Sequence, residues 1–90
     1  MKRVYVYISG RVQGVFFRAE TQSTAINLNL TGWVHNIADG RVEAVFEGDD
    51  DNIDKMLVWC HIGPPAARVE EVLTEEQPHT GDFRDFSIKY

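Results

Sequence analysis

The sequence has little of several features that usually define a structural class. It contains a single cysteine, Cys60, so no disulfide can form within the chain, whereas small secreted domains usually carry several. No apolar run approaches the roughly 20 residues of a membrane-spanning helix. The residues after Met1 alternate between polar and apolar side chains, unlike the continuous apolar segment of a signal peptide. These absences predict a cytoplasmic protein with no membrane partner.

Positive charge is also scarce, and it is unevenly distributed. The chain has 14 acidic and 9 basic residues, and its net charge is −5. Residues 1–19 nevertheless hold four basic residues and no acidic one: Lys2, Arg3, Arg11 and Arg18. An acidic chain is a poor candidate for non-specific nucleic-acid binding, so we expect no nucleic-acid partner. A local basic segment within an acidic protein suits a small anion better.

The length and composition limit the number of domains. Ninety residues, 43% of them apolar and none in a low-complexity tract, suffice for one small hydrophobic core. We expect residues 1–90 to form a single domain, and the size and charge of the chain favour a monomer.

The spacing of apolar residues predicts both strands and helices. Alternating apolar residues are typical of a strand, and a stripe at every third or fourth residue is typical of a helix. Strands are predicted over residues 2–9, 31–37, 41–47, 68–76 and 83–90, and helices over residues 17–29 and 49–61. Asn29 is predicted to end the first helix in a left-handed conformation. The acidic segment 49–52 is predicted to cap the second helix.

The predicted core combines alternating strand residues with one stripe of each helix. Its members are Val4, Val6, Ile8, Phe17, Thr21, Ala25, Leu28, Val42, Ala44, Phe46, Ile53, Met56, Leu57 and Cys60. Trp33 and Trp59 are expected to be core or packing aromatics. The element order β-α-β-β-α-β, followed by a short strand, predicts an α+β ferredoxin-like sandwich. In that fold, an antiparallel sheet carries two helices on one face.

The start of the first helix breaks two local rules. No Ser, Thr, Asp or Asn stands before Phe17 to cap it, so the first backbone N–H groups lack partners. Arg18 lies in the first turn, where the helix dipole disfavours positive charge. A bound anion resolves both problems, because it accepts hydrogen bonds from the N–H groups and pairs with the guanidinium. Gly10 and Gly14 allow the backbone angles and close approach that such a cradle needs.

Taken alone, this loop also fits a simple strand-to-helix turn with an exposed arginine. It is not a Walker A loop, since no Gly-Lys-Ser/Thr follows, and its glycines do not have the spacing of a dinucleotide-binding fingerprint. The residues by themselves predict an anion site and leave the anion open.

Two segments resemble the signatures of a known enzyme family. Residues 10–18, GRVQGVFFR, are similar to the signature loop of the acylphosphatases, and residues 32–43, GWVHNIADGRVE, are similar to their second signature. Segments 63–69 and 86–90 also fit the family's pattern. The resemblance covers essentially the whole chain, and it implies a ferredoxin-like fold and the hydrolysis of acyl phosphates.

The resemblance also implies roles for individual residues. Arg18 would bind the phosphoryl group, and Asn36 would position the attacking water. The phosphoryl oxygens would be bound by backbone N–H groups of the loop Gln13, Gly14, Val15, Phe16, Phe17 and Arg18. No metal, cofactor or covalent intermediate is expected. No general acid is required either, because a carboxylate leaving group with a conjugate-acid pKa of about 4 departs unprotonated. The expected partners are an acyl phosphate substrate and inorganic phosphate, or another anion, as product or inhibitor.

Other reactive side chains are expected to be structural. His35 precedes Asn36 in a strand, so the two side chains point to opposite faces. His61 lies next to Cys60 on a helix, where adjacent positions diverge, and no second ligand pair at zinc spacing is present. Cys60 falls on the buried stripe of its helix and is not expected to act as a nucleophile.

A binding module is the main alternative to an enzyme. Tyr5 and Tyr7 lie on the outward side of the first strand, and exposed aromatics on a ferredoxin-like sheet stack RNA bases in some modules. The third strand, however, lacks the basic-Gly-aromatic motif of those modules. A third class is a non-catalytic module that senses phosphate or another anion, or handles carbamoyl phosphate. Acylphosphatase-like domains also occur fused within larger maturation proteins.

Overall fold

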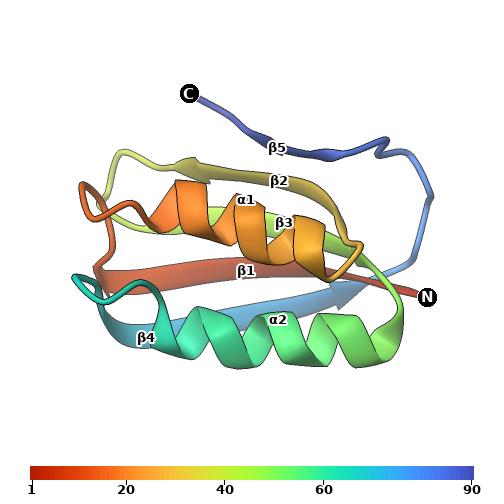
Figure 1. The fold of residues 1–90 in the computed structure, drawn as a ribbon, viewed down its shortest axis with the longest axis horizontal. Helices are drawn as coiled ribbons and strands as arrows, with labels where there is room; N and C mark the ends of the chain where they lie inside the picture. Colours follow the sequence, from red (N-terminus) through yellow and green to blue (C-terminus); the bar gives the residue numbers. More distant parts are fainter.

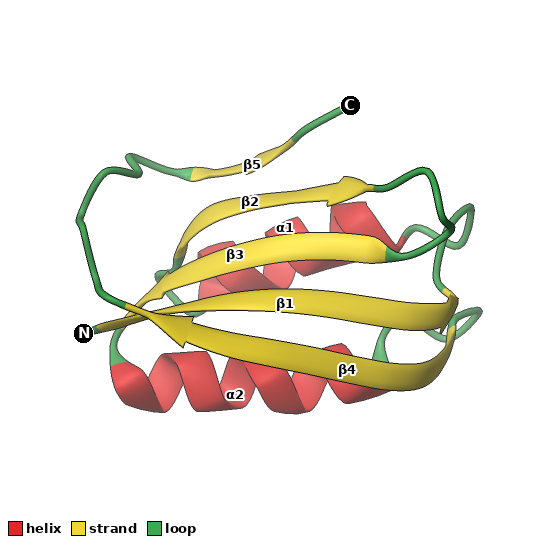
Figure 2. Cartoon of the chain, turned by 180° about the vertical axis from the view of Figure 1, so that it is seen from behind, coloured by secondary structure: helices red, strands yellow, loops and turns green.

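In the computed structural model, which describes residues 1–90, two helices pack on a five-stranded sheet (Figure 1). The strands are β1 (Lys2–Arg11), β2 (Thr31–Asn36), β3 (Val42–Gly48), β4 (Arg68–Gln77) and β5 (Phe86–Ile88), and the helices are α1 (Phe17–Asn27) and α2 (Asp50–Ile62). Both helices cover the same face, and they lie behind the sheet in the opposite view (Figure 2). This is the α+β arrangement predicted from the sequence.

The sheet differs from the prediction at one edge. Its strand order is β4-β1-β3-β2-β5, and the first four strands pair antiparallel as expected. β5 pairs parallel with β2, so the sheet is mixed. The connection after β4 crosses the end of the sheet and enters the opposite edge in the direction of β2 (Figure 1). β5 is also shorter than predicted. Phe83 lies outside the strand, and its ring centroid is 4.8 Å from the guanidinium carbon of Arg3.

The core lies between the sheet and the helices. Of the predicted core residues, all are buried except Leu28 and Leu57, which are half-buried and pack against the others. Trp59 packs on Phe17 with ring centroids 5.4 Å apart, as expected of a packing aromatic. Trp33 is instead half-buried on the open face of the sheet, beside Tyr5. Burial of the apolar face contributes about 25 cal/mol per Å² of apolar surface.

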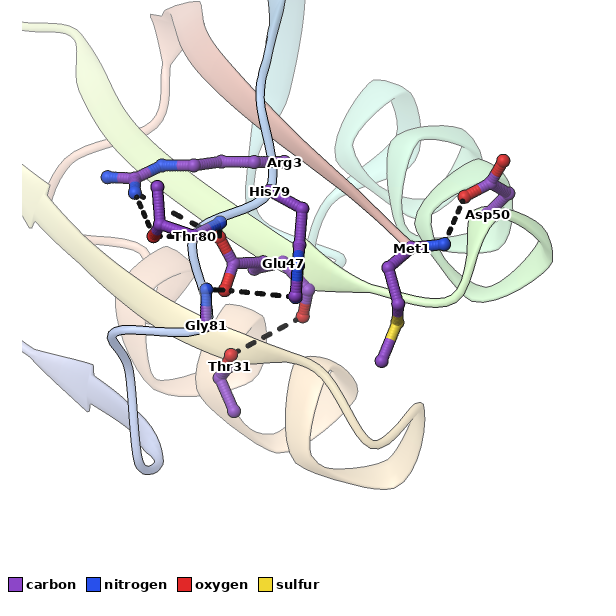
Figure 3. Close-up of polar contacts among 8 residues, drawn as sticks. All are labelled: Met1, Arg3, Thr31, Glu47, Asp50, His79, Thr80 and Gly81. Atoms are coloured by element: carbon purple, nitrogen blue, oxygen red, sulfur yellow. Dashed lines mark hydrogen bonds and ion pairs between the residues drawn. The ribbon is translucent and has the colours of Figure 1, made fainter.

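The predicted helix ends are partly correct. Asn29 has a left-handed φ of 57°, as expected, although α1 already ends at Asn27. Asp49 precedes α2 but makes no side-chain capping hydrogen bond, so the predicted cap is wrong. The acidic segment acts through charge instead, because Asp50 and Asp51 lie in the first turn and Asp50 pairs with the amino group of Met1 at 3.3 Å (Figure 3). Neither helix has the length and apolar character needed to cross a membrane.

Gly10 directs the chain from β1 into the loop that follows. The pairing of β1 with β4 shifts register between Ser9 and Gly10, and Gly10 has a φ of 124°. A Cβ atom there would lie 2.1 Å from the carbonyl oxygen of Arg68, so only glycine fits. This irregularity turns the end of β1 toward the start of α1.

Candidate active site

The loop between β1 and α1 is anchored by apolar side chains that point into the core. Val12, Val15 and Phe17 are each at most 5% exposed. Phe16, between two of them, is 78% exposed. These three inward-facing side chains therefore hold the loop from the inside. Its path is fixed, although residues 12–16 belong to no helix or strand.

Gln13 ties this loop to the connection between β2 and β3. Its side-chain Nε2 donates hydrogen bonds to the carbonyl oxygens of Ile37, at 2.9 Å, and of Arg41, at 3.0 Å. The Gln13 side chain is thus used within the protein, and only its backbone N–H is available to an anion. These two bonds hold the end of β2, where Asn36 lies, against the loop.

The loop backbone has the geometry of an anion cradle. Gly14 has a φ of 73° and Phe16 a φ of 65°, while Val15 between them has a negative φ. Such alternation turns successive N–H groups toward one concave side. No backbone N–H from Gln13 to Ala19 donates a hydrogen bond within the chain; the first to do so is that of Glu20, to the carbonyl of Phe16. The predicted uncapped helix start is therefore present, and it extends back into the loop.

Arg18 extends from the first turn of α1 and makes no ion pair. Its guanidinium carbon lies 5.0 Å from the centroid of the Tyr90 ring, a cation–π distance. No carboxylate neutralises its charge, so the guanidinium is free to pair with an anion.

Asn36 ends β2 with a buried acceptor that has no partner. Its Oδ1 atom is inaccessible and accepts no hydrogen bond from the protein. An unpaired buried polar atom destabilises a fold by about 1–3 kcal/mol, so it calls for an explanation. Because Asn36 lines the cavity described below, rotation of its amide toward that cavity would let a water donate a hydrogen bond to Oδ1.

A cavity of about 280 Å³ brings these features together. Its lining residues are Val12, Gly14, Phe16, Phe17, Arg18, Ala19, Asn36, Ile88 and Tyr90. Arg18 and Asn36, which are 18 positions apart in the sequence, thus share one site. Gln13 and Val15 do not line it with their side chains, because one bonds to the β2–β3 connection and the other enters the core.

Sequence reasoning missed the contribution of the chain end. Ile88 and Tyr90 line the cavity because β5 pairs parallel with β2, and its last residue, Ile88, lies opposite Val34, two positions before Asn36. The local sequence signal is the spacing of Phe86, Ile88 and Tyr90 at every second residue, which is typical of a strand. That pattern does not reveal which strand will be the partner.

The side chains set aside as structural lie elsewhere. His35 points to the opposite face from Asn36 and pairs with Glu43. Cys60 is fully buried, and burial raises the pKa of its thiol to about 12, which suppresses the thiolate. No group of three or more His, Cys, Asp or Glu side chains is arranged to hold a metal ion.

Comparison with known proteins identifies the family. The family model described as Acylphosphatase matches residues 4–88. The chain belongs to the acylphosphatase family. An acylphosphatase of Rubrobacter xylanophilus is 57% identical over 88 residues, which cover 98% of this chain and 80% of that protein.

Solved acylphosphatase structures have the same fold. The structure from Bacillus subtilis matches with a TM-score of 0.96 and 34% identity, over all of both chains. The structure from Coxiella burnetii matches with a TM-score of 0.93 and 42% identity, over 98% of this chain and 92% of that one. The predicted ferredoxin-like fold and the predicted enzyme class, an acylphosphatase, are confirmed.

Proposed function

We propose that this acylphosphatase cleaves its substrate by in-line attack of a water molecule, with Arg18 and the loop amides binding the phosphoryl group and Asn36 orienting the water. The observation that carries the proposal is that Asn36, whose Oδ1 atom has no partner in the protein, lines the same cavity as the unpaired Arg18. One group is an acceptor suited to water, and the other is a cation suited to a phosphoryl group.

The phosphoryl group is bound by positive potential from two sources. The N–H groups of residues 13–18 donate to its oxygens, and the Arg18 guanidinium supplies a full charge and a planar pair of donors. In a loose transition state the charge lies on these oxygens. Preorganised donors therefore stabilise the transition state without a metal ion or a covalent intermediate.

The water is positioned by Asn36. Its Oδ1 accepts one hydrogen bond, which orients an oxygen lone pair of the water toward phosphorus. A new P–O bond forms to this water as the bond from phosphorus to the acyl oxygen breaks. The electron pair of the broken bond remains on the carboxylate, and the water proton passes to a phosphoryl oxygen of the substrate. No side chain needs to act as general acid, because the carboxylate leaves unprotonated.

The test is hydrolysis of benzoyl phosphate in the presence of EDTA, followed as release of inorganic phosphate. We expect metal-independent turnover in the wild type. Arg18→Ala and Asn36→Ala should each lower kcat/KM by at least about 100-fold, the size of effect seen when one group that stabilises the transition state is removed. Arg84→Ala, which removes an exposed arginine outside the cavity, is the matched control and should retain wild-type turnover.

Two outcomes would contradict the mechanism. Near-normal turnover by Arg18→Ala would show that the guanidinium is not needed. Loss of wild-type activity on addition of EDTA would show that a metal ion takes part.

A further inference from the structure

The cavity is larger than the group that the loop binds. With each heavy atom given the roughly 30 Å³ that a water molecule occupies in the liquid, a phosphoryl group fills less than half of the 280 Å³. The remaining walls are not formed by the cradle. They are formed mainly by the side chains of Phe16, Ile88 and Tyr90.

These remaining walls are apolar, and two of them are exposed aromatic rings. Phe16 is 78% exposed and Tyr90 is 97% exposed. Among the side chains that line the cavity, only Arg18 is charged. Since the phosphoryl group takes this guanidinium, no second cation lines the cavity for a negative charge elsewhere on the substrate.

The backbone conformation of Phe16 is unfavourable, and burial of its ring does not offset the strain. Its φ of 65° is rare for a bulky residue, and its ring gains little from burial because it is mostly exposed. A glycine would adopt the same backbone conformation without strain. Strained positions of this kind cluster at active sites and ligand-binding segments.

We propose that Phe16, Ile88 and Tyr90 form the binding site for the acyl group, and that the enzyme selects acyl phosphates whose acyl group is uncharged and apolar. This inference rests on the function proposed above and names the substrate class of the same site. An aryl or branched alkyl group covers the two rings and removes apolar surface from water. An acyl group that carries a carboxylate loses part of its hydration against the apolar wall and finds no partner there.

The experiment compares kcat/KM for benzoyl, acetyl and succinyl phosphate, whose acyl groups are aromatic, small and anionic. The kcat/KM of each variant is divided by that of the wild type for the same substrate, so that the intrinsic reactivity of each substrate cancels. Phe16→Ala should reduce the preference for benzoyl over acetyl phosphate about tenfold, which corresponds to about 1.4 kcal/mol. Tyr90→Ala should reduce it in the same direction, and Phe16→Leu, which keeps an apolar side chain, should reduce it less.

A second Phe16 variant tests whether a preference for an anionic acyl group can be introduced. Phe16→Lys should raise the preference for succinyl over benzoyl phosphate by more than tenfold, because it supplies the missing cation and removes the ring. Val58→Ala shortens an apolar side chain that is 63% exposed and lies outside the cavity, and should leave both preferences at their wild-type values.

The two proposals fail in different ways. Unchanged preferences in the Phe16 and Tyr90 variants, together with loss of all turnover in Arg18→Ala, would refute the acyl site and leave the proposed mechanism standing. A wild-type protein that hydrolyses none of the three substrates would refute both.

Discussion

Gln13 shows how a single side chain can control the site without touching the substrate. Its amide joins the loop between β1 and α1, which we propose binds the phosphoryl group, to the β2–β3 connection through two carbonyl oxygens. The distance between the loop and Asn36 therefore depends on it. In the proposed mechanism, two groups that act on one phosphorus atom are carried by different elements, and a displacement of about 1 Å can lower the rate about 100-fold.

We expect Gln13→Ala to impair both stability and catalysis. Loss of two partly buried hydrogen bonds should lower the free energy of unfolding by about 1–3 kcal/mol. The kcat for benzoyl phosphate should fall more than its KM rises, because the loop amides that bind the phosphoryl group remain while Asn36 is no longer held against them. Urea denaturation and steady-state kinetics measure the two effects. A large rise in KM at constant kcat would contradict this account.

Glu43 gives the open face of the sheet a defined response to acid. Burial alone would raise its pKa, but hydrogen bonds from His35, Tyr7 and Tyr5 outweigh burial and lower it. Because the folded-state pKa lies below that of an unfolded glutamate, about 4.3, the carboxylate stabilises the fold fully above that value. The stabilisation is lost as the pH falls through the folded-state pKa.

Glu43→Gln should therefore flatten part of the acid dependence of stability. We expect the variant to be less stable than the wild type at about pH 6, and the difference should shrink toward about pH 3. Urea denaturation at several pH values measures it. A difference that stays constant across this range would mean that the Glu43 charge does not contribute.

At the level of elements, the loop 10–18 was predictable because its signals are local. The missing cap, the arginine in the first turn and the two glycines all lie within nine residues, and the structure preserves each of them. The pairing of β5 was not predictable, because its partner β2 lies about 50 positions earlier in the chain and a three-residue strand carries almost no pattern. The contribution of Ile88 and Tyr90 to the cavity was missed for that reason.

The buried carboxylate of Glu47 was missed for a similar reason. Alternation correctly placed Val42, Ala44 and Phe46 toward the helices and left Glu47 on the other face, where solvent exposure is the default. It is only 2% exposed because the β4–β5 connection folds over it. Burial by a distant segment leaves no trace in the local sequence.

The bulge at Gly10 is an element-level feature with a large expected effect. Gly10→Ala places a Cβ atom against the backbone of β4 at a φ that alanine rarely adopts. Both the clash and the strain oppose the native turn, so the free energy of unfolding should fall by more than about 2 kcal/mol.

Gly40→Ala is the matched control for this prediction. Gly40 also has a positive φ, of 98°, but an added Cβ atom would meet nothing within 4 Å. Gly40→Ala should therefore lower the free energy of unfolding only through the unfavourable φ that alanine must adopt. Equal destabilisation of the two variants, measured by thermal unfolding, would show that the close approach of β4 is unimportant.

For the whole molecule, one carboxylate holds together segments that are distant in sequence. Glu47 Oε1 accepts a hydrogen bond from the N–H of Gly81 at 2.9 Å, and Oε2 accepts one from the N–H of Thr80 at 3.1 Å (Figure 3). Arg3 and His79 lie 3.9 and 3.5 Å from its oxygens. These contacts pin the connection that carries the chain from one edge of the sheet to the other.

Glu47→Ala should destabilise the whole fold by about 3–5 kcal/mol, because it leaves the Arg3 charge and two backbone N–H groups without their partner. Glu47→Gln keeps the size of the side chain and one acceptor oxygen, and should destabilise the fold less than Glu47→Ala. Hydrogen exchange should show loss of protection at Gly32 and Lys89, whose N–H groups bond to Asp85 and Val34. Loss of protection spread evenly over all strands would argue against a specific role in holding the β4–β5 connection.

The main-chain N–H groups of the loop between β1 and α1 have no partner in the chain, while Val12, Val15 and Phe17 face inward. Substitution of a side chain can therefore bend the loop, but it cannot delete a single donor. At 90 residues the chain is within reach of chemical synthesis, in which one amide can be replaced by an ester. Exchanging the N–H of one loop residue for oxygen would remove one donor and leave every side chain in place. The share of each donor in binding the phosphoryl group could then be measured atom by atom.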